Sequence, residues 1–156
     1  MPEFPQQSSA SIEIAAPPAA VWALVADVTR MGEWSPVCKA CWWEECDGPS
    51  VGAVFAGRNE TPDRTWETKN KIVAADRGTE FAWEVLGTHA RWGYTFAPVD
   101  GGTEVTERWD LPAEGIAFFE ERMGDDAPAQ IAAREQGAID GMKETLAAIK
   151  KAAEAG

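Results

Sequence analysis

Three cysteines and two tryptophans fall within nine residues, in the stretch CKACWWEEC at positions 38–46. A C-x-x-C sequence can bind a metal ion or form a redox-active disulfide. In a strand, residues an odd number apart point to opposite faces, so Cys38 and Cys41 are predicted to point away from each other. A structural zinc site usually takes four Cys or His ligands, and the chain has three cysteines and one histidine. We therefore interpret the stretch as an aromatic strand with reduced thiols, and we expect no metal site and no cofactor.

Glu107 is the best candidate for acid–base chemistry in this chain. Apolar residues flank it in the same register of a predicted strand, and an apolar environment would raise the pKa of its carboxyl group toward neutrality. Tyr94 or His89 could be its hydrogen-bond partner. The alternatives stay open: Glu107 could lie at the sheet edge, paired with an arginine such as Arg64 or Arg91. His89, next to a turn, could be a solvated loop residue.

The elements that position these residues follow from hydrophobic periodicity. The stretch SIEIAA at 11–16 alternates as a strand does, and two short helices are predicted after it, in PAAVWALVAD and VTRMGEW. From residue 37 to residue 111 the pattern has a period of two, and turn residues separate its segments. The six predicted strands are 37–46, 52–60, 65–75, 79–87, 90–98 and 103–111. Connections this short predict an antiparallel meander with one aromatic face and one wet face.

A long amphipathic segment follows, APAQIAAREQGAIDGMKETLAAIKKAAEA. Its apolar residues recur at helical spacing, which predicts a helix of about 28 residues, roughly 40 Å long, that covers the aromatic face. Gly137 and Gly141 lie on one side of this helix. They could form a smooth patch that a ligand approaches, or they could mark tight packing of helix on sheet.

Composition excludes several classes of partner. The chain carries 26 acidic and 14 basic residues, a formal net charge of −12, and no Lys/Arg cluster that could follow a phosphate backbone. We therefore expect no nucleic acid partner and no membrane insertion. Without a recognisable secretory signal, we expect a cytoplasmic protein. We predict a flexible tail at 1–9, one domain at 10–154, and a monomer or homodimer. Eight tryptophans indicate an oversized apolar interior.

The order strand, helix pair, meander and long helix resembles the START/Bet v 1-like superfamily, and most closely its polyketide cyclase/dehydrase-like (SRPBCC) branch. The stretches that carry the resemblance are IEIAAPPAAVWALVADVTRMGEWSPV, VGAVFAGRN, RTWETKNKIVAADRGTEFAWEV and RWGYTFAPVDGGTEVTERWDL. The resemblance implies an α+β helix-grip fold. In that fold a curved antiparallel sheet of about seven strands wraps around the C-terminal helix, and two short helices follow the first strand. It also implies a deep cavity that holds hydrophobic ligands such as lipids, sterols or polyketides.

Our first hypothesis is therefore that the chain binds a hydrophobic small molecule between sheet and helix. The predicted ligand-binding residues are Trp22, Trp34, Trp42, Phe55, Asn59, Trp66, Asn70, Phe81, Trp83, Trp92, Tyr94, Phe96, Trp109, Phe118 and Gly141. Two alternatives are a polyketide cyclase or dehydratase that uses Glu107 as general acid/base, and a protein-interaction module. It also stays open whether the tryptophans line a cavity or fill it.

Overall fold

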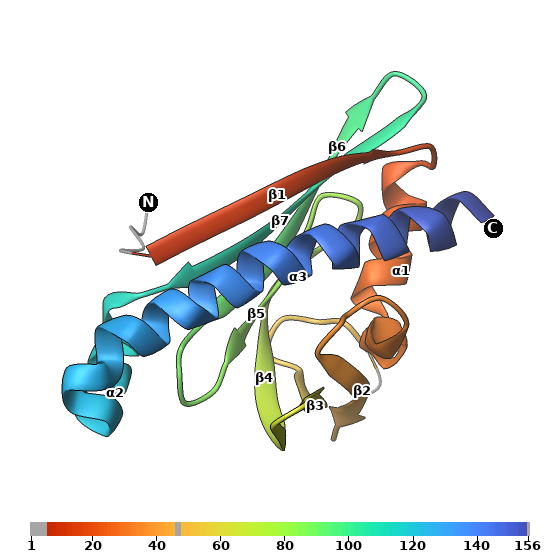
Figure 1. The fold of residues 1–156 in the computed structure, drawn as a ribbon. Helices are drawn as coiled ribbons and strands as arrows, with labels where there is room; N and C mark the ends of the chain where they lie inside the picture. The colour runs from red at the N-terminus through yellow and green to blue at the C-terminus, as the bar shows by residue number, and fades with distance from the viewer. Residues whose placement is uncertain (1–5, 46–47, 156) are drawn as a thin grey trace.

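The computed structural model describes residues 6–45 and 48–155, and its sheet has seven strands in the order β1-β7-β6-β5-β4-β3-β2. The elements in chain order are β1 (Gln6–Ile14), α1 (Pro18–Ala26), η1 (Val28–Glu33), β2 (Cys38–Glu44), β3 (Val54–Thr61), β4 (Arg64–Asp76), β5 (Glu80–Val85), β6 (Arg91–Val99), β7 (Gly102–Leu111), α2 (Ala113–Met123), η2 (Gly124–Asp126) and α3 (Ala127–Ala155). Neighbouring strands pair antiparallel, and α3 crosses one face of the sheet (Figure 1). The predicted α+β helix-grip fold is confirmed.

The first strand begins earlier than predicted. The predicted tail spans 1–9, yet β1 starts at Gln6, which pairs with Leu111 at the far end of β7. Residues 1–5 lie outside the described part of the chain. The polar stretch at 6–9 forms a strand because β7 supplies a backbone partner along its whole length. Ser8 also donates a hydrogen bond across 3.1 Å to Glu135 of α3. The polar composition of residues 6–9 therefore gave no indication that they form part of an edge strand.

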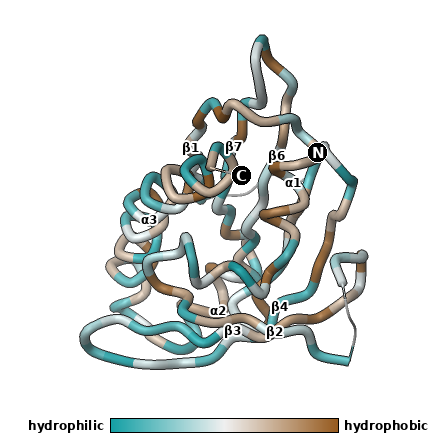
Figure 2. Tube along the Cα trace, turned by 90° about the vertical axis from the view of Figure 1, so that its right-hand side faces the viewer, coloured by the Kyte–Doolittle hydropathy of each residue, from teal (hydrophilic) through white to brown (hydrophobic). Residues whose placement is uncertain are grey.

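Helix α3 supplies core residues to two clusters along its length. Leu146 and Ile149 join the larger cluster, which includes α1 and the middle of the sheet. Ile131 and Ala138 join a smaller one, with α2 and the end of β7. Figure 2 shows brown hydrophobic positions interspersed with teal hydrophilic ones along the helix, as expected when one side is buried. No helix in the described ranges is long and apolar enough to span a membrane.

The two glycines of α3 are not sites of tight helix–sheet packing, so that interpretation is wrong. A Cβ atom placed on Gly137 would meet nothing within 4 Å. On Gly141 it would meet only Pro36 Cγ, at 3.7 Å, which is ordinary van der Waals contact. The backbone therefore has room beside both residues. The alternative, that a ligand approaches this side of the helix, stays a prediction.

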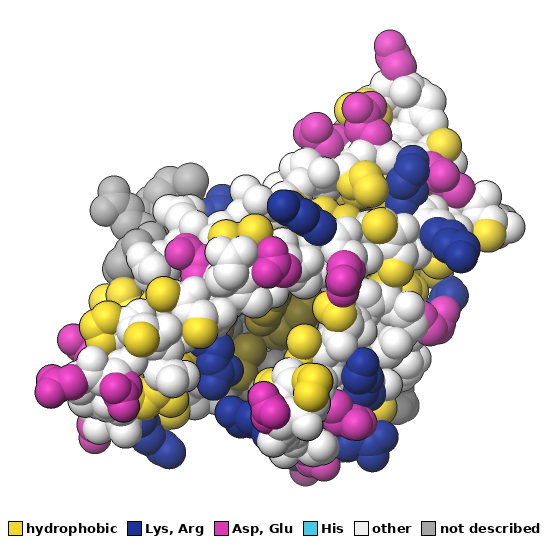
Figure 3. All heavy atoms as spheres, in the orientation of Figure 1, with side chains coloured by type: hydrophobic (Ala, Val, Ile, Leu, Met, Phe, Trp, Pro, Cys, Tyr) yellow, Lys and Arg dark blue, Asp and Glu magenta, His cyan; other side chains and the backbone are white. Residues whose placement is uncertain are grey.

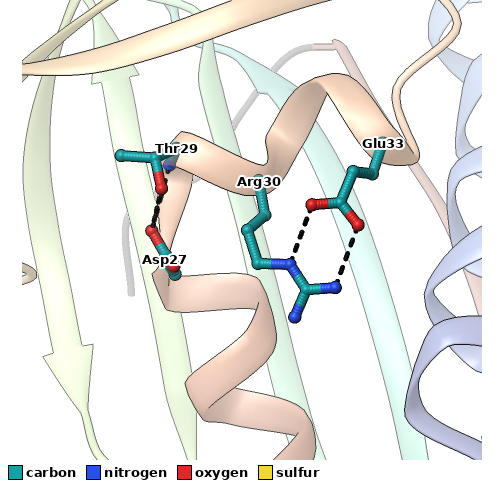
Figure 4. Close-up of polar contacts among 4 residues, drawn as sticks. All are labelled: Asp27, Thr29, Arg30 and Glu33. Atoms are coloured by element: carbon teal, nitrogen blue, oxygen red, sulfur yellow. Dashed lines mark hydrogen bonds and ion pairs between the residues drawn. The ribbon is translucent and has the colours of Figure 1, made fainter. Parts of the chain in front are cut away.

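A capped turn joins α1 to η1. Asp27 Oδ1 accepts hydrogen bonds from the backbone N–H and the hydroxyl of Thr29, at 3.2 and 2.5 Å. Arg30 donates from two guanidinium nitrogens to the two carboxylate oxygens of Glu33, each across 2.9 Å (Figure 4). These contacts stabilise η1 itself, and η1 packs so closely on β2 that a Cβ atom on Gly32 would lie 2.3 Å from a β2 carbonyl oxygen.

Strand β2 contains a bulge that changes which residues face inward. Its register on β3 shifts between Cys38 and Ala40. A bulge adds one residue to a strand, so residues three apart can return to the same face. Cys38 and Cys41 are both buried, and their Sγ atoms lie 3.1 Å apart. The prediction that these cysteines point to opposite faces is therefore wrong.

The same bulge decides which tryptophan of β2 faces the interior. Trp42 is 38% exposed, on the outer face. Trp43 lies opposite Phe55 in register, and the two rings meet edge to face with centroids 5.9 Å apart. The prediction that Trp42 lines the interior is wrong, because the inserted residue gives that position to Trp43.

Candidate ligand-binding site

A carboxyl–phenol pair is buried on the inward face of the sheet. Glu107 of β7 lies opposite Tyr94 of β6, and Tyr94 Oη donates to Glu107 Oε2 across 3.0 Å. Each residue is only 3% exposed, and Glu107 Oε1 has no hydrogen-bond partner among the described residues. Burial raises the pKa of Glu107 to about 8, although the hydrogen bond from Tyr94 acts in the opposite direction. Burial, and secondarily the charge of Glu107, raise the pKa of Tyr94 well above its usual value.

This geometry gives the Glu107 carboxyl group two possible roles. At pH values below about 8 the group is neutral. Because Tyr94 already donates to Oε2, the carboxyl proton is best placed on Oε1, where it can be donated to an acceptor atom of a ligand. A carboxyl group whose pKa lies near neutrality can also give and take protons during a reaction. The pair can therefore recognise a ligand oxygen or transfer a proton.

Of the two partners predicted for Glu107, the structure confirms Tyr94 and not His89. His89 Nδ1 lies 3.2 Å from Glu84 Oε1, in a loop and on a partly exposed side chain, which confirms the interpretation of His89 as a loop residue. The alternative of an arginine-paired Glu107 is wrong. Arg91 lies 3.6 Å from a carboxylate oxygen of Glu80, and Arg64 lies over a tryptophan ring of its own strand.

A continuous wall of aromatic rings runs across β3, β5 and β6 beside this pair. Neighbouring ring centroids are 5.5 Å apart for Phe55 and Trp83, 5.8 Å for Phe81 and Trp83, and 6.0 Å for Trp83 and Tyr94. Phe96 continues the wall beyond Tyr94, at 6.4 Å. Aromatic contacts at these spacings are favourable beyond their buried area. The polar pair therefore lies within this apolar surface, because Tyr94 is itself one of the rings of the wall.

The structure brings together most of the residues predicted to line the interior. Those that are buried are Trp22, Trp34, Phe55, Asn70, Phe81, Trp83, Tyr94, Phe96 and Trp109. Those that are half-buried are Asn59, Trp66, Trp92, Phe118 and Gly141. Trp109 belongs to the smaller cluster at α2, and Phe118 packs against that cluster, so these two lie apart from the aromatic wall.

Two predicted polar residues lie together on β3 and β4. Asn70 is 3% exposed, and its Nδ2 lies 3.3 Å from both the backbone oxygen of Phe55 and Thr68 Oγ1. Asn59 Nδ2 lies 3.4 Å from the same hydroxyl. These contacts show that Asn70 stabilises the pairing of β3 with β4 from the inside. The half-buried Asn59 is the more accessible of the two.

A hollow opens between α3 and the strands below it, with hydrophobic side chains on its floor and basic side chains near its rim (Figure 3). Two arginines come from the elements that border it. Arg64 of β4 lies over the Trp66 ring at 4.2 Å, and Arg134 of α3 lies over the Phe119 ring at 5.6 Å. Burial lowers the pKa of Arg134, and the nearby charge of Arg64 lowers it further. Sequence reasoning missed this pair, because no local signal links positions 70 residues apart.

The single tyrosine of the chain makes the Glu107–Tyr94 pair directly observable. We expect the NMR signal of a ¹³Cζ-tyrosine label to shift with pH, with a midpoint at about pH 8, because ionisation of Glu107 changes the hydrogen bond that Tyr94 donates. The same label in Glu107→Gln should show no such midpoint. A midpoint below pH 6 in the wild-type protein would contradict the assigned burial of the carboxyl group.

The family model described as "Polyketide cyclase / dehydrase and lipid transport" matches residues 5–154. The chain belongs to this family. No curated protein matches the chain. Among solved structures, the family member is similar to the polyketide cyclase-like protein Cgl2372 from Corynebacterium glutamicum. The two are 45% identical with a TM-score of 0.70, over 99% of this chain and 94% of that one.

More distant members of the fold superpose equally well. The di-domain ARO/CYC StfQ of the steffimycin biosynthetic pathway is 15% identical with a TM-score of 0.73, over 96% of this chain and 50% of that one. Ara h 8.0201 is 16% identical with a TM-score of 0.64, over 97% and 99% of the two chains. At these identities the likeness shows the fold alone. The family model and the likeness to Cgl2372 together identify the chain as a polyketide cyclase-like protein of the SRPBCC class, and its fold is that of Ara h 8.0201.

Proposed function

We propose that the protein binds a hydrophobic small molecule, such as a lipid, a polyketide or another aromatic compound, in a cavity between the sheet and α3. The buried pair of Glu107 and Tyr94 is the observation that carries this proposal. An unpaired buried polar atom costs free energy, and Glu107 Oε1 is such an atom beside the aromatic wall. A ligand with an acceptor oxygen, such as a carbonyl or hydroxyl group, would satisfy it.

The surroundings support an elongated or flat ligand with one polar end. Ligand sites of this kind are mainly apolar with a few placed polar groups. The rings of Phe55, Trp83 and Tyr94 supply the apolar surface. Arg64 of β4 and Arg134 of α3 lie near each other, and neither has an ion pair among the described residues, so an anionic group of a ligand between these elements would be attracted to them. The family description includes both polyketide chemistry and lipid transport.

Tryptophan fluorescence titration with fatty acids, sterols, flavonoids and aromatic polyketides tests the proposal. We expect saturable quenching or energy transfer for at least one class, because Trp83 lies within the wall and Trp92 and Trp43 are half-buried beside the core. The absence of a saturable response to every class would mean that the aromatic rings fill the interior.

A matched pair of α3 variants distinguishes the cavity from the outer surface. Gly141→Phe extends a ring from the side of α3 that has room beside Pro36, and it is expected to weaken binding at least about tenfold, or 1.4 kcal/mol. Ala147→Phe places the same ring at an exposed position of the same helix and should leave affinity unchanged. Equal affinity for both variants and the wild-type protein would place the ligand elsewhere.

A second candidate function is that of a cyclase or dehydratase that uses Glu107 as general acid/base. The pKa of about 8 for this carboxyl group favours it, since an efficient acid–base catalyst has a pKa near the working pH. For an enzyme, Glu107→Gln should retain binding within about threefold and lose at least about 100-fold in turnover of a β-carbonyl substrate. For a binding protein, no turnover is found in either form.

A further inference from the structure

The thiols of Cys38 and Cys41 form a buried pair on β2 that the proposed ligand recognition does not use. Their Sγ atoms are 3.1 Å apart, and each residue is 7% exposed. We propose that this pair is a redox modification site, at which a peroxide or a low-molecular-weight disulfide converts the two thiols into an intramolecular disulfide. The inference rests on the geometry of β2 and does not depend on the proposed ligand-binding function.

The spacing of the sulfur atoms favours a disulfide over a metal chelate. A disulfide bond is about 2.05 Å long, so the two atoms need to approach by about 1 Å. Two thiolates on one tetrahedral zinc ion, with bonds of about 2.3 Å, would stand about 3.8 Å apart. Met31 Sδ is the next sulfur atom, 3.8 Å from Cys41 Sγ. The pair is therefore already closer than a chelate allows.

The surrounding backbone holds the two sulfur atoms together. The bulge in β2 turns Cys38 and Cys41 to the same face, and Cys41 lies opposite Gly57 of β3 in register. A Cβ atom on Gly57 would lie 3.4 Å from both Sγ atoms, so the glycine leaves just the space that they occupy. The hydroxyl of Ser35 accepts a hydrogen bond from the backbone N–H of Cys38 across 2.9 Å and fixes the start of the strand.

The two thiols also differ in how readily they ionise, which sets the order in which they react. The hydrogen bond between the thiols lowers the pKa of Cys38 and raises that of Cys41, so Cys38 is the thiol that ionises first. With hydrogen peroxide, the Cys38 thiolate attacks one peroxide oxygen, and the other oxygen leaves as hydroxide, which takes a proton to become water. Cys41 sulfur then attacks the resulting sulfenic sulfur of Cys38 and expels the second water. Two thiols thereby reduce one peroxide to two waters.

Exchange with a small disulfide reaches the same product. The Cys38 thiolate attacks one sulfur of oxidised glutathione. This attack joins Cys38 to one glutathione in a mixed disulfide and releases the other glutathione as a thiolate, which takes up a proton. Cys41 then attacks the Cys38 sulfur, loses its proton and releases the second glutathione. Strand β2 is at the edge of the sheet, where local opening costs less than at its centre and exposes the thiols to a small reagent.

The test measures how readily the pair oxidises in the folded and the unfolded chain. Cys46→Ser is the background, so that positions 38 and 41 hold the only thiols. The protein is equilibrated in glutathione redox buffers with and without 8 M urea, acid-quenched, and alkylated in denaturant with N-ethylmaleimide. Intact mass then counts free thiols. Trypsin cleaves after Lys39, so a disulfide joins peptide 31–39 to peptide 40–58 in a non-reducing digest.

We expect the native pair to oxidise with an equilibrium constant at least about tenfold larger than that of the urea-unfolded chain, because the fold holds the thiols in contact. The linked peptides 31–39 and 40–58 should then appear. By linkage, the oxidised protein should also unfold at higher urea concentration than the reduced protein. The proposal would be overturned if the native protein kept two free thiols in a buffer that oxidises the unfolded chain. The contact between Cys38 and Cys41 would then be a buried hydrogen bond between thiols and nothing more. In Cys41→Ser, Cys38 should stop at the mixed disulfide.

Discussion

Replacing Glu107 by Gln is expected to change the pH dependence of stability more than any other substitution of an acidic residue in the described chain. The pKa of this carboxyl group is about 8 in the folded protein and about 4.5 in an exposed one. Between these values the folded chain holds a proton that the unfolded chain has lost. The wild-type protein therefore loses stability as pH rises through this window, and the loss is complete above pH 8.

The size of the effect follows from the shift. Each pKa unit corresponds to about 1.36 kcal/mol, so the wild-type protein should lose on the order of 4 kcal/mol relative to Glu107→Gln between pH 5 and pH 9. Urea denaturation of both proteins at the two pH values measures the difference. Glu104→Gln, at an exposed position of the same strand, should follow the wild-type curve. Parallel curves for Glu107→Gln and the wild-type protein would mean that Glu107 titrates as an exposed residue.

Replacing Phe55 by Ala is expected to lower the free energy of unfolding by about 4 kcal/mol. Phe55 is 1% exposed and meets Trp43 and Trp83 edge to face, so the substitution removes a fully buried ring from the aromatic wall. Truncation of a buried phenylalanine to alanine typically costs 3–5 kcal/mol, from lost burial and from the cavity left behind. Urea denaturation at neutral pH measures the change.

Trp42→Ala is the matched control, from the strand next to Phe55. Trp42 is larger than phenylalanine but is 38% exposed on the outer face, so its removal should cost only about 1 kcal/mol. An equal loss of stability in Phe55→Ala and Trp42→Ala would contradict the inward assignment of Phe55 and Trp43. A larger loss of stability in Trp42→Ala than in Phe55→Ala would mean that Trp42 faces the interior, as a strand without the bulge predicts.

The meander and the position of Glu107 could be predicted because alternation along a regular strand fixes which side chains share a face. Glu107 follows Val105 and precedes Trp109 in one register, and the structure buries all three. Its partner Tyr94 sits in the same register of the neighbouring strand, so the pair follows from two alternating patterns.

The bulge in β2 could not be predicted, because one inserted residue leaves no mark in the composition of the strand. Its effect is nevertheless large, since every side chain after the bulge points to the opposite face of the sheet from the one that simple alternation predicts. It moved Trp42 outward, Trp43 inward, and Cys41 beside Cys38. Arg64 and Arg134 lie on β4 and α3, and only the folded chain brings them near each other. The start of β1 could not be predicted either, because the polar residues there are typical of a flexible tail. Backbone pairing with β7 makes them a strand.

The measurement that tests ligand binding most directly is the NMR signal of the ¹³Cζ-labelled tyrosine during titration with oleic acid and with a planar flavonoid. The chain has one tyrosine, so the signal reports only on the Glu107–Tyr94 pair. A ligand in the proposed cavity should shift this signal saturably, and Gly141→Phe should weaken the response at least about tenfold, while Ala147→Phe leaves it unchanged. A signal that stays fixed at saturating concentrations of both probes would contradict the account.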